Sequence, residues 1–140
     1  MIIHVYIQLL GDTFSPSAAE EATGLVLLDK REPGHIGQRG RYRDKPVPYG
    51  VASLDAPTNV PPAGKLSWVI DRALPHIEAL REMGADRSEV WIVEHFDGQA
   101  NMYYTPEELA KLAQLGLPLC VSGYEVEQLF PRLKGYEPAV

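Results

Sequence analysis

The chain has 140 residues, 45% hydrophobic and 23% charged, so we expect residues 1–140 to form one globular domain with its own core. The net charge of −6 argues against nucleic acid or an anionic membrane surface as a partner of the whole protein. We expect a cytoplasmic protein without a disulfide, metal site or cofactor. The reasons are that Cys120 is the only cysteine, no signal-peptide pattern starts the chain, and no apolar run reaches the roughly 20 residues of a membrane span.

The first elements in chain order are a strand and a short helix. Residues 4–10 alternate between apolar and polar side chains, which predicts a strand. Ser15 is a good N-cap, Pro16 suits the first helical position, and Gly24 can adopt the left-handed conformation that ends helices. These residues together predict a helix over residues 16–23.

An irregular basic loop is expected over residues 29–48, between an extended segment at 25–28 and a strand at 49–55. The loop is rich in glycine and proline and poor in apolar residues, and long loops of this kind are usually functional or disordered. Between positions 30 and 45, six positive and two negative residues give +4, which leaves −10 for the rest of the chain. Such segregation indicates a surface for an anion or an acidic protein partner, and a merely solvated loop is the alternative interpretation. The six cations are Lys30, Arg31, Arg39, Arg41, Arg43 and Lys45.

The strongest helical pattern covers residues 66–83, where apolar residues recur at spacings of three and four. Pro75 interrupts this pattern, and a proline in a helix interior costs about 3 kcal/mol or more. We therefore expect either a kink at Leu74-Pro75 or two consecutive helices, ending at Gly84.

A strand is predicted over residues 89–96, followed by a hairpin turn at Asp97-Gly98 and a return strand over residues 100–104. Thr105 and Glu108 then form the capping-box pattern of a helix start.

Residues 117–126 predict the last strand, and residues 127–140 a tail over the surface. This order predicts an α+β fold, with a single antiparallel or mixed sheet of about five strands and helices packed mainly on one face.

No residue pattern identifies a catalytic or metal centre. The four histidines are far apart and form no His-Glu-x-x-His pair. Cys120 is flanked by apolar residues and has no nearby cation in sequence that would activate its thiol. On the exposed face of the sheet, His95, Asp97 and Tyr103 are the candidates for a small-molecule site. Aromatic residues on the predicted strands either pack across strands or line a ligand groove or a dimer interface; they are Tyr6, Trp91, Tyr103, Tyr104 and Tyr124.

The residues that begin and end the predicted helices and strands resemble the pattern of a bacterial family. The shared signals are Leu10-Gly11-Asp12, Ser15-Pro16 with Gly24, Trp68 before Leu74-Pro75, and Pro106-Glu107-Glu108-Leu109. Over most of residues 5–126 the chain resembles the domain-of-unknown-function family 4279. Ala52 departs from that pattern, since a Trp is expected there, and the basic loop is longer than the pattern has it. The resemblance implies a small bacterial α+β domain without an assigned activity, and it carries over no catalytic residue.

Three functions stay open on the sequence. The first is a binding or interaction module without catalytic activity, immunity-like or accessory, whose six loop cations face an acidic protein partner. The second is a small-molecule-binding domain or small enzyme that uses His95, Asp97 and Tyr103. The third is a homodimeric structural protein assembled through an open edge or face of the sheet.

Overall fold

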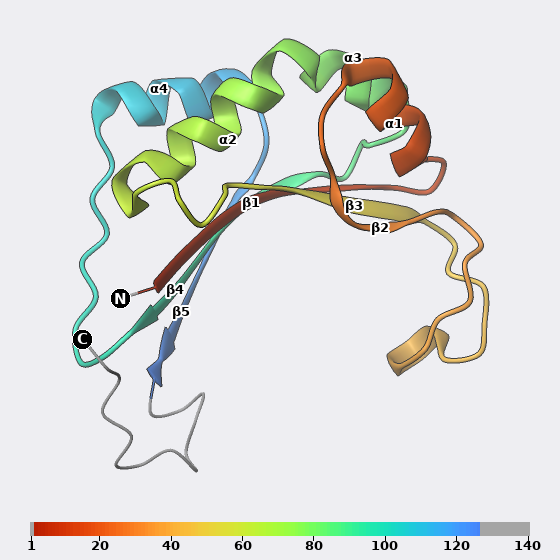
Figure 1. Cartoon of the computed structure of the whole chain (residues 1–140), viewed down its shortest axis with the longest axis horizontal. Coiled ribbons are helices and arrows are strands. Elements are labelled where there is room, and N and C mark those ends of the chain that lie inside the picture. The colour runs from red at the N-terminus through yellow and green to blue at the C-terminus, as the bar shows by residue number, and fades with distance from the viewer. Residues whose placement is uncertain (1, 127–140) are drawn as a thin grey trace.

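A computed structural model describes residues 2–126, which form one five-stranded mixed sheet with helices over one of its faces (Figure 1). This confirms the predicted α+β class. The predicted tail at 127–140 lies outside the described residues. The elements are β1 (Ile2–Gly11), α1 (Pro16–Thr23), β2 (Leu28–Arg31), β3 (Gly50–Asp55), α2 (Lys65–Ala73), α3 (Ile77–Glu82), β4 (Glu89–Phe96), α4 (Pro106–Leu115) and β5 (Leu119–Glu125), with 3₁₀ turns at Gly40–Tyr42, Pro62–Gly64 and Leu74–His76.

The sheet has the strand order β2-β3-β1-β4-β5, so the first strand lies at its centre. β1 pairs antiparallel with both β3 and β4, and β2 pairs antiparallel with β3. β4 and β5 pair in parallel, with Trp91 opposite Cys120. A parallel pair needs a long connection, and α4 provides it on the helix-covered side (Figure 1).

The predicted return strand at residues 100–104 is wrong. Residues 97–105 contain a bend and no strand, although Gly98 has the positive φ of 76° that a tight turn favours. The edge of β4 that a hairpin would have used is occupied by β5. Residues 97–105 instead lead to α4, and on this path Tyr104 packs against the core.

Local capping signals are confirmed where the sequence placed them. The Ser15 hydroxyl accepts a hydrogen bond from the Ala18 backbone N–H at 3.3 Å, and Gly24 ends α1 with φ 75°. Thr105 and Glu108 form the predicted capping box of α4. A 3₁₀ turn at Leu74–His76 separates α2 from α3, so Pro75 divides the long apolar pattern into two helices.

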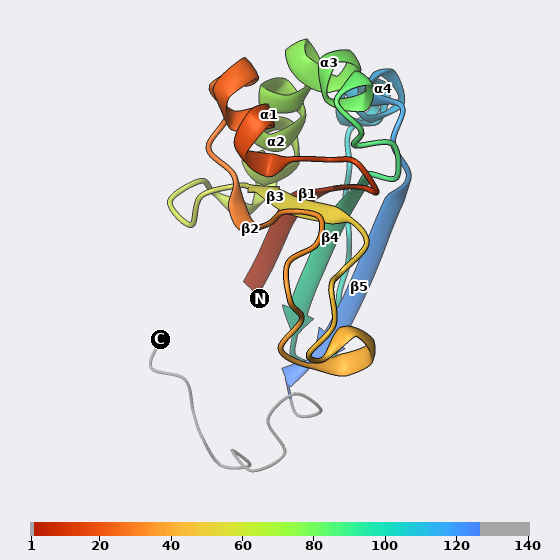
Figure 2. The ribbon, with the colours of Figure 1, turned by 90° about the vertical axis from the view of Figure 1, so that its right-hand side faces the viewer.

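The core lies between the sheet and the helices. Val5, Ile7 and Leu9 alternate along β1 with at most 3% of each exposed, and they face the helix layer together with Val69 and Ile70 of α2. Within residues 2–126, no α-helix packs on the opposite face of the sheet, which we call the helix-free face, and the connection from β2 to β3 projects on that side (Figures 1 and 2). In the part of the chain that the structure describes, no helix is long and apolar enough to cross a membrane.

Candidate functional site

The connection between β2 and β3, residues 32–49, is the β2–β3 loop. It falls largely within the predicted irregular loop, but β2 begins at Leu28 and takes residues 29–31 from it. Backbone hydrogen bonds hold the two arms of the loop together: Gly34 N–H donates to Val47 O at 2.7 Å, and Val47 N–H donates to His35 O at 2.8 Å. Val47 is only 5% exposed, so the loop has a small buried anchor of its own.

The tip of the loop closes on itself through Gly37. Its N–H donates to Lys45 O at 3.0 Å, and its carbonyl accepts from Asp44 N–H at 2.8 Å. A Cβ at position 37 would lie 2.2 Å from the Tyr42 carbonyl oxygen, so this turn needs glycine for close approach. These hydrogen bonds and the close approach at Gly37 therefore fix the backbone path of the loop.

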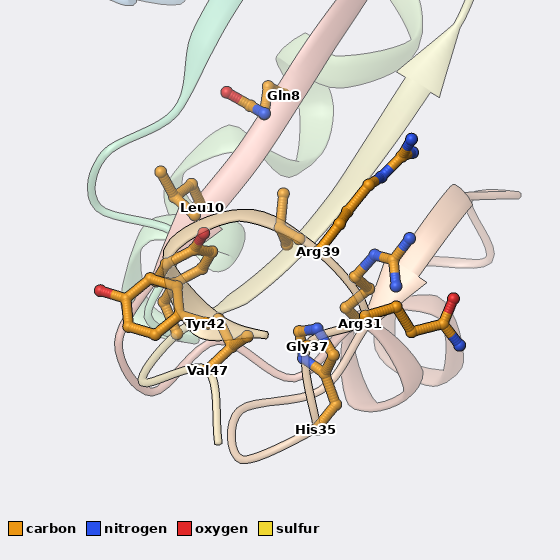
Figure 3. A pocket seen from close by; sticks show the side chains of 11 residues that line it. Gln8, Leu10, Arg31, His35, Gly37, Arg39, Tyr42 and Val47 are labelled. Atoms are coloured by element: carbon orange, nitrogen blue, oxygen red, sulfur yellow. The ribbon is translucent and has the colours of Figure 1, made fainter. Parts of the chain in front are cut away.

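A cavity of about 540 Å³ lies between the β2–β3 loop and the helix-free face of the sheet; we call it the loop groove (Figure 3). This volume falls in the range of about 300–1,000 Å³ that is usual for ligand sites. Polar and aliphatic side chains of β1 and β3 form one part of the lining, and cationic and aromatic side chains of β2 and the loop form another. The lining residues are Gln8, Leu10, Val51, Arg31, His35, Gly37, Gln38, Arg39, Tyr42, Val47 and Tyr49.

Two cations give the loop groove its electrostatic character. Arg31 ends β2 and Arg39 lies in the loop, and Figure 3 shows both side chains on one side of the groove with Tyr42 across from them. Within residues 2–126, neither guanidinium forms an ion pair. Two cations that line one cavity without a carboxylate between them favour an anion there. The imidazole of His35 also lines the groove, and its Nδ1 lies 2.9 Å from the Glu32 carbonyl oxygen.

The other four predicted loop cations do not line the groove. Lys30 pairs with Glu20 of α1 at 2.7 Å. The Arg41 guanidinium lies over the Tyr42 ring at 5.5 Å from its centroid. Arg43 lies 4.0 Å from its neighbour Asp44, and Lys45 is exposed. The structure thus brings two of the six predicted residues, Arg31 and Arg39, together at one site.

A second cavity of about 420 Å³ adjoins the loop groove and shares Gln8, Arg31 and Val51 with it. Its wall includes Ser53 and Asp55 of β3. The Ser53 hydroxyl oxygen and one Asp55 carboxylate oxygen are buried and have no hydrogen-bond partner within residues 2–126. Unpaired buried polar atoms are costly, and such atoms commonly mark a site for water or ligand. The helix-free face therefore offers a cationic end at Arg31 and Arg39 and an acceptor-rich end at Ser53 and Asp55.

The small-molecule candidates named from the sequence are not brought together. His95 lies on the helix-free face, where its ring stacks on Tyr124 with centroids 5.7 Å apart and meets the edge of His4 at 5.6 Å. Tyr103 is 84% exposed and lines a cavity with Val5 and Leu66, which face the helices. Asp97 is exposed in the bend after β4. His95 and Tyr103 therefore belong to opposite sides of the sheet.

Aromatic side chains pack across strands on the helix-free face. The Tyr6 and Trp91 rings are stacked across β1 and β4, with an interplanar angle of 9° and centroids 6.4 Å apart. Burial, and then the negative charge of Asp55, raise the pKa of the Tyr6 phenol. Tyr6 therefore keeps its proton at neutral pH and can donate a hydrogen bond to a ligand in the second cavity, which it lines.

Sequence reasoning missed the lining residues other than the two arginines. Gln8 occupies the polar phase of β1, and His35, Tyr42 and Tyr49 lie in or beside the basic segment. The available signal was their position near the cations in sequence, but only the folded loop shows that they share one cavity. Within residues 2–126, no group of three or more His, Cys, Asp and Glu side chains is placed to hold a metal ion. Comparisons with protein families, with curated proteins and with solved structures found no match to this chain.

Proposed function

We propose that the protein is a binding module that recognises a carboxylate-rich segment of a partner protein in the loop groove. One observation carries this proposal: Arg31 and Arg39 line the same cavity of about 540 Å³, and neither forms an ion pair within the described residues. A guanidinium presents a planar fork of N–H donors that matches a carboxylate, often with two parallel hydrogen bonds. Both groups are therefore available to an incoming acid.

The lining around the two arginines supports a peptide segment as the ligand. Tyr42 and Tyr49 supply aromatic surface with polar hydroxyl ends, and Gln8 supplies both a donor and an acceptor. Arginine and tyrosine are the residue types most often found at the energetic centres of protein interfaces. The Arg41 guanidinium lies over the Tyr42 ring and helps to hold that ring in place.

The negative charge of the rest of the molecule favours specific binding of an acidic partner at the loop over non-specific binding elsewhere on the surface. The net charge is −6 overall, so a highly acidic partner is repelled by most of the surface and attracted at the loop. Such a distribution orients the partner before contact. We also propose that the chain is related to the domain-of-unknown-function family 4279. That resemblance carries over no catalytic residue, so it is compatible with a binding module.

The test uses a fluorescein-labelled octaglutamate peptide, with octaglutamine as the uncharged comparison, and follows fluorescence anisotropy. We expect octaglutamate to bind and octaglutamine not to bind. The affinity for octaglutamate should fall as the salt concentration is raised. The double variant Arg31→Gln/Arg39→Gln should bind about tenfold more weakly or worse, because each charged hydrogen bond is worth about 1.5–3 kcal/mol.

Arg72→Gln is the matched control. It removes an arginine of α2 whose guanidinium lies over Trp68, 4.8 Å from the ring centroid, on the helix side of the molecule. Its affinity for octaglutamate should equal that of the unmodified protein. An equal loss in both variants would mean that bulk charge, not the groove, attracts the peptide. Binding of inorganic phosphate without octaglutamate binding would replace the peptide with a small anion as ligand.

A further inference from the structure

A buried glutamate lies on the helix-covered side of β4, away from the loop groove. Glu94 follows Val90 and Ile92 in the inward-facing phase of the strand and is only 2% exposed. No ion pair joins it within residues 2–126, and its Oε2 atom is buried without a hydrogen-bond partner. An ionised carboxylate buried without a partner is strongly unfavourable. This carboxylate therefore calls for a positively charged or hydrogen-donating group from outside.

Glu94 forms part of the wall of a cavity of about 250 Å³, the Glu94 cavity. β1, β4, the 3₁₀ turn Pro62–Gly64, α2, the 97–105 connection and the start of α4 contribute to its wall. Figure 1 shows the 97–105 connection rising from the end of β4 to α4. One part of the lining is apolar and the other part is polar. The apolar residues are Ile3, Val5, Pro62, Ala63 and Leu66, and the polar ones are Glu94, Asn101, Tyr103, Tyr104 and Glu108.

The charges on the cavity wall are of one sign. Glu94 and Glu108 are the charged residues of the lining, and both are acidic. Glu108 uses its Oε1 atom to accept from the Thr105 N–H and hydroxyl in the capping box, so Glu94 is the carboxylate left without local partners. The ammonium of Lys65, a buried residue at the start of α2, donates to the Ile3 carbonyl oxygen at 2.8 Å and forms no ion pair with Glu94.

The same two negative charges affect the phenol of Tyr104, which also lines the cavity. Burial raises the pKa of its phenol, and the negative charges of Glu94 and Glu108 raise it further. The phenol is therefore protonated at neutral pH, and the Asn101 amide, which lines the same cavity, has both a donor and an acceptor.

We propose that the Glu94 cavity binds the ammonium group of a small primary amine, with Glu94 as its counter-ion and the aliphatic stem against Ile3, Val5 and Leu66. An ammonium has three donors and no acceptor, which suits a wall of carboxylate, phenol and amide oxygens. The two carboxylates fall short of the three or more ligands expected of a divalent metal site, and no such group is found within residues 2–126. The cavity is smaller than the roughly 300 Å³ at the low end of usual ligand pockets, so the amine has only a few carbons.

The probe is n-butylammonium chloride, followed by amide chemical shifts of the ¹⁵N-labelled full chain at neutral pH, with n-butanol as the uncharged comparison. We expect saturable shifts confined to amides of residues 92–96 and 101–108 with butylammonium, and none with butanol. Glu94→Gln keeps the shape of the side chain and removes its charge, and it should weaken binding about tenfold or more.

Glu107→Gln is the matched control, because Glu107 is the neighbouring acid in the first turn of α4 and is exposed. It should leave the butylammonium affinity unchanged. Should Glu94→Gln fail to fold, Ala63→Leu takes its place, since it fills the cavity from its wall and leaves both carboxylates intact. That variant should also abolish the saturable shifts.

Three results would overturn the proposal. The first is the absence of saturable shifts in the unmodified protein. The second is equal binding of butanol and butylammonium, which would make the cavity merely apolar. The third is binding that appears only in Lys65→Met, because Lys65 would then be the internal partner of Glu94 in solution and the cavity would take no ligand amine.

Discussion

Gly11, at the end of β1, passes so close to Gly84 that a Cβ on Gly11 would lie 1.6 Å from the Gly84 carbonyl oxygen. Gly84 itself has φ 101°, and its own Cβ position is crowded by Thr13. Next to this contact, Arg87 N–H donates to the Leu10 carbonyl at 2.9 Å, and the Arg87 side chain pairs with Asp12. The turn that follows α3 is therefore fixed against the end of the central strand by two glycines.

We expect Gly11→Ala to lower the free energy of unfolding by about 3 kcal/mol or more, because the backbone of one of these segments must move. Urea denaturation measures the change. Gly98→Ala is the comparison: Gly98 has a positive φ of 76°, and no described atom lies within 4 Å of its Cβ position. It should cost only about 1 kcal/mol from backbone strain. Equal costs for both variants would show that close approach at Gly11 has little weight.

Short-range signals predicted most of the helices because each of them depends on neighbouring residues. Ser15 and Gly24 bound α1, Thr105 caps α4, and Pro75 divides α2 from α3 as the sequence indicated. Gly11 and Gly84 were likewise recognisable as ends of elements. That these two ends meet is a long-range fact, and no local pattern carries it.

Strand pairing was the weaker part of the prediction for the same reason. Asp97-Gly98 has the composition of a hairpin turn, yet the second strand that pairs with β4 is β5. Seven residue pairs join the two strands, and β5 begins more than twenty positions after β4 ends. The parallel pairing places α4 over the core and leaves residues 100–104 outside the sheet. A turn signal gives the local bend and not the partner strand.

The positive charge of the candidate site could be predicted from the sequence, but the residues that line it could not. The excess of cations between positions 30 and 45 is visible in the sequence, but Lys30 and Arg31 are neighbours on β2 that diverge in role. Lys30 pairs with Glu20 of α1, and Arg31 lines the loop groove. Glu94 gave a signal that went unused, since an acid in the apolar phase of a buried strand is unusual.

Gly37 tests whether the shape of the β2–β3 loop matters for the proposed function. We expect Gly37→Ala to weaken octaglutamate binding about tenfold, as Arg31→Gln/Arg39→Gln does, because the added Cβ would collide with the Tyr42 carbonyl and displace the groove wall. Hydrogen exchange should show unchanged protection of the β1 amides, since the collision is confined to the loop. Gly34→Ala adds a methyl with no described atom within 4 Å, at a glycine with φ 87°. It bears backbone strain of about 1 kcal/mol without the collision, so it should bind octaglutamate more strongly than Gly37→Ala. Full affinity in Gly37→Ala would separate binding from the loop path.

Cys120 of β5 is expected to be a slow nucleophile. Burial raises the pKa of its thiol, and Glu89 raises it further, because its carboxylate accepts the thiol hydrogen bond at 3.5 Å and adds a negative charge. A raised pKa means a smaller thiolate fraction at any pH below it, and the thiolate is the species that reacts. The rate of alkylation by iodoacetamide should therefore keep rising with pH beyond the value of about 8.5 that is usual for free cysteine.

Glu89→Gln removes the charge while its amide can still contact the Trp91 indole, whose N–H donates to Glu89 at 3.1 Å. This variant should shift the midpoint of the pH–rate profile downward and raise the alkylation rate near neutral pH. A short Leu-Cys-Val peptide provides the reference rate. The midpoint, rather than the rate at one pH, decides the matter, because restricted access lowers the plateau without moving the midpoint. A midpoint at or below that of the peptide would contradict the influence of burial and Glu89 on this thiol.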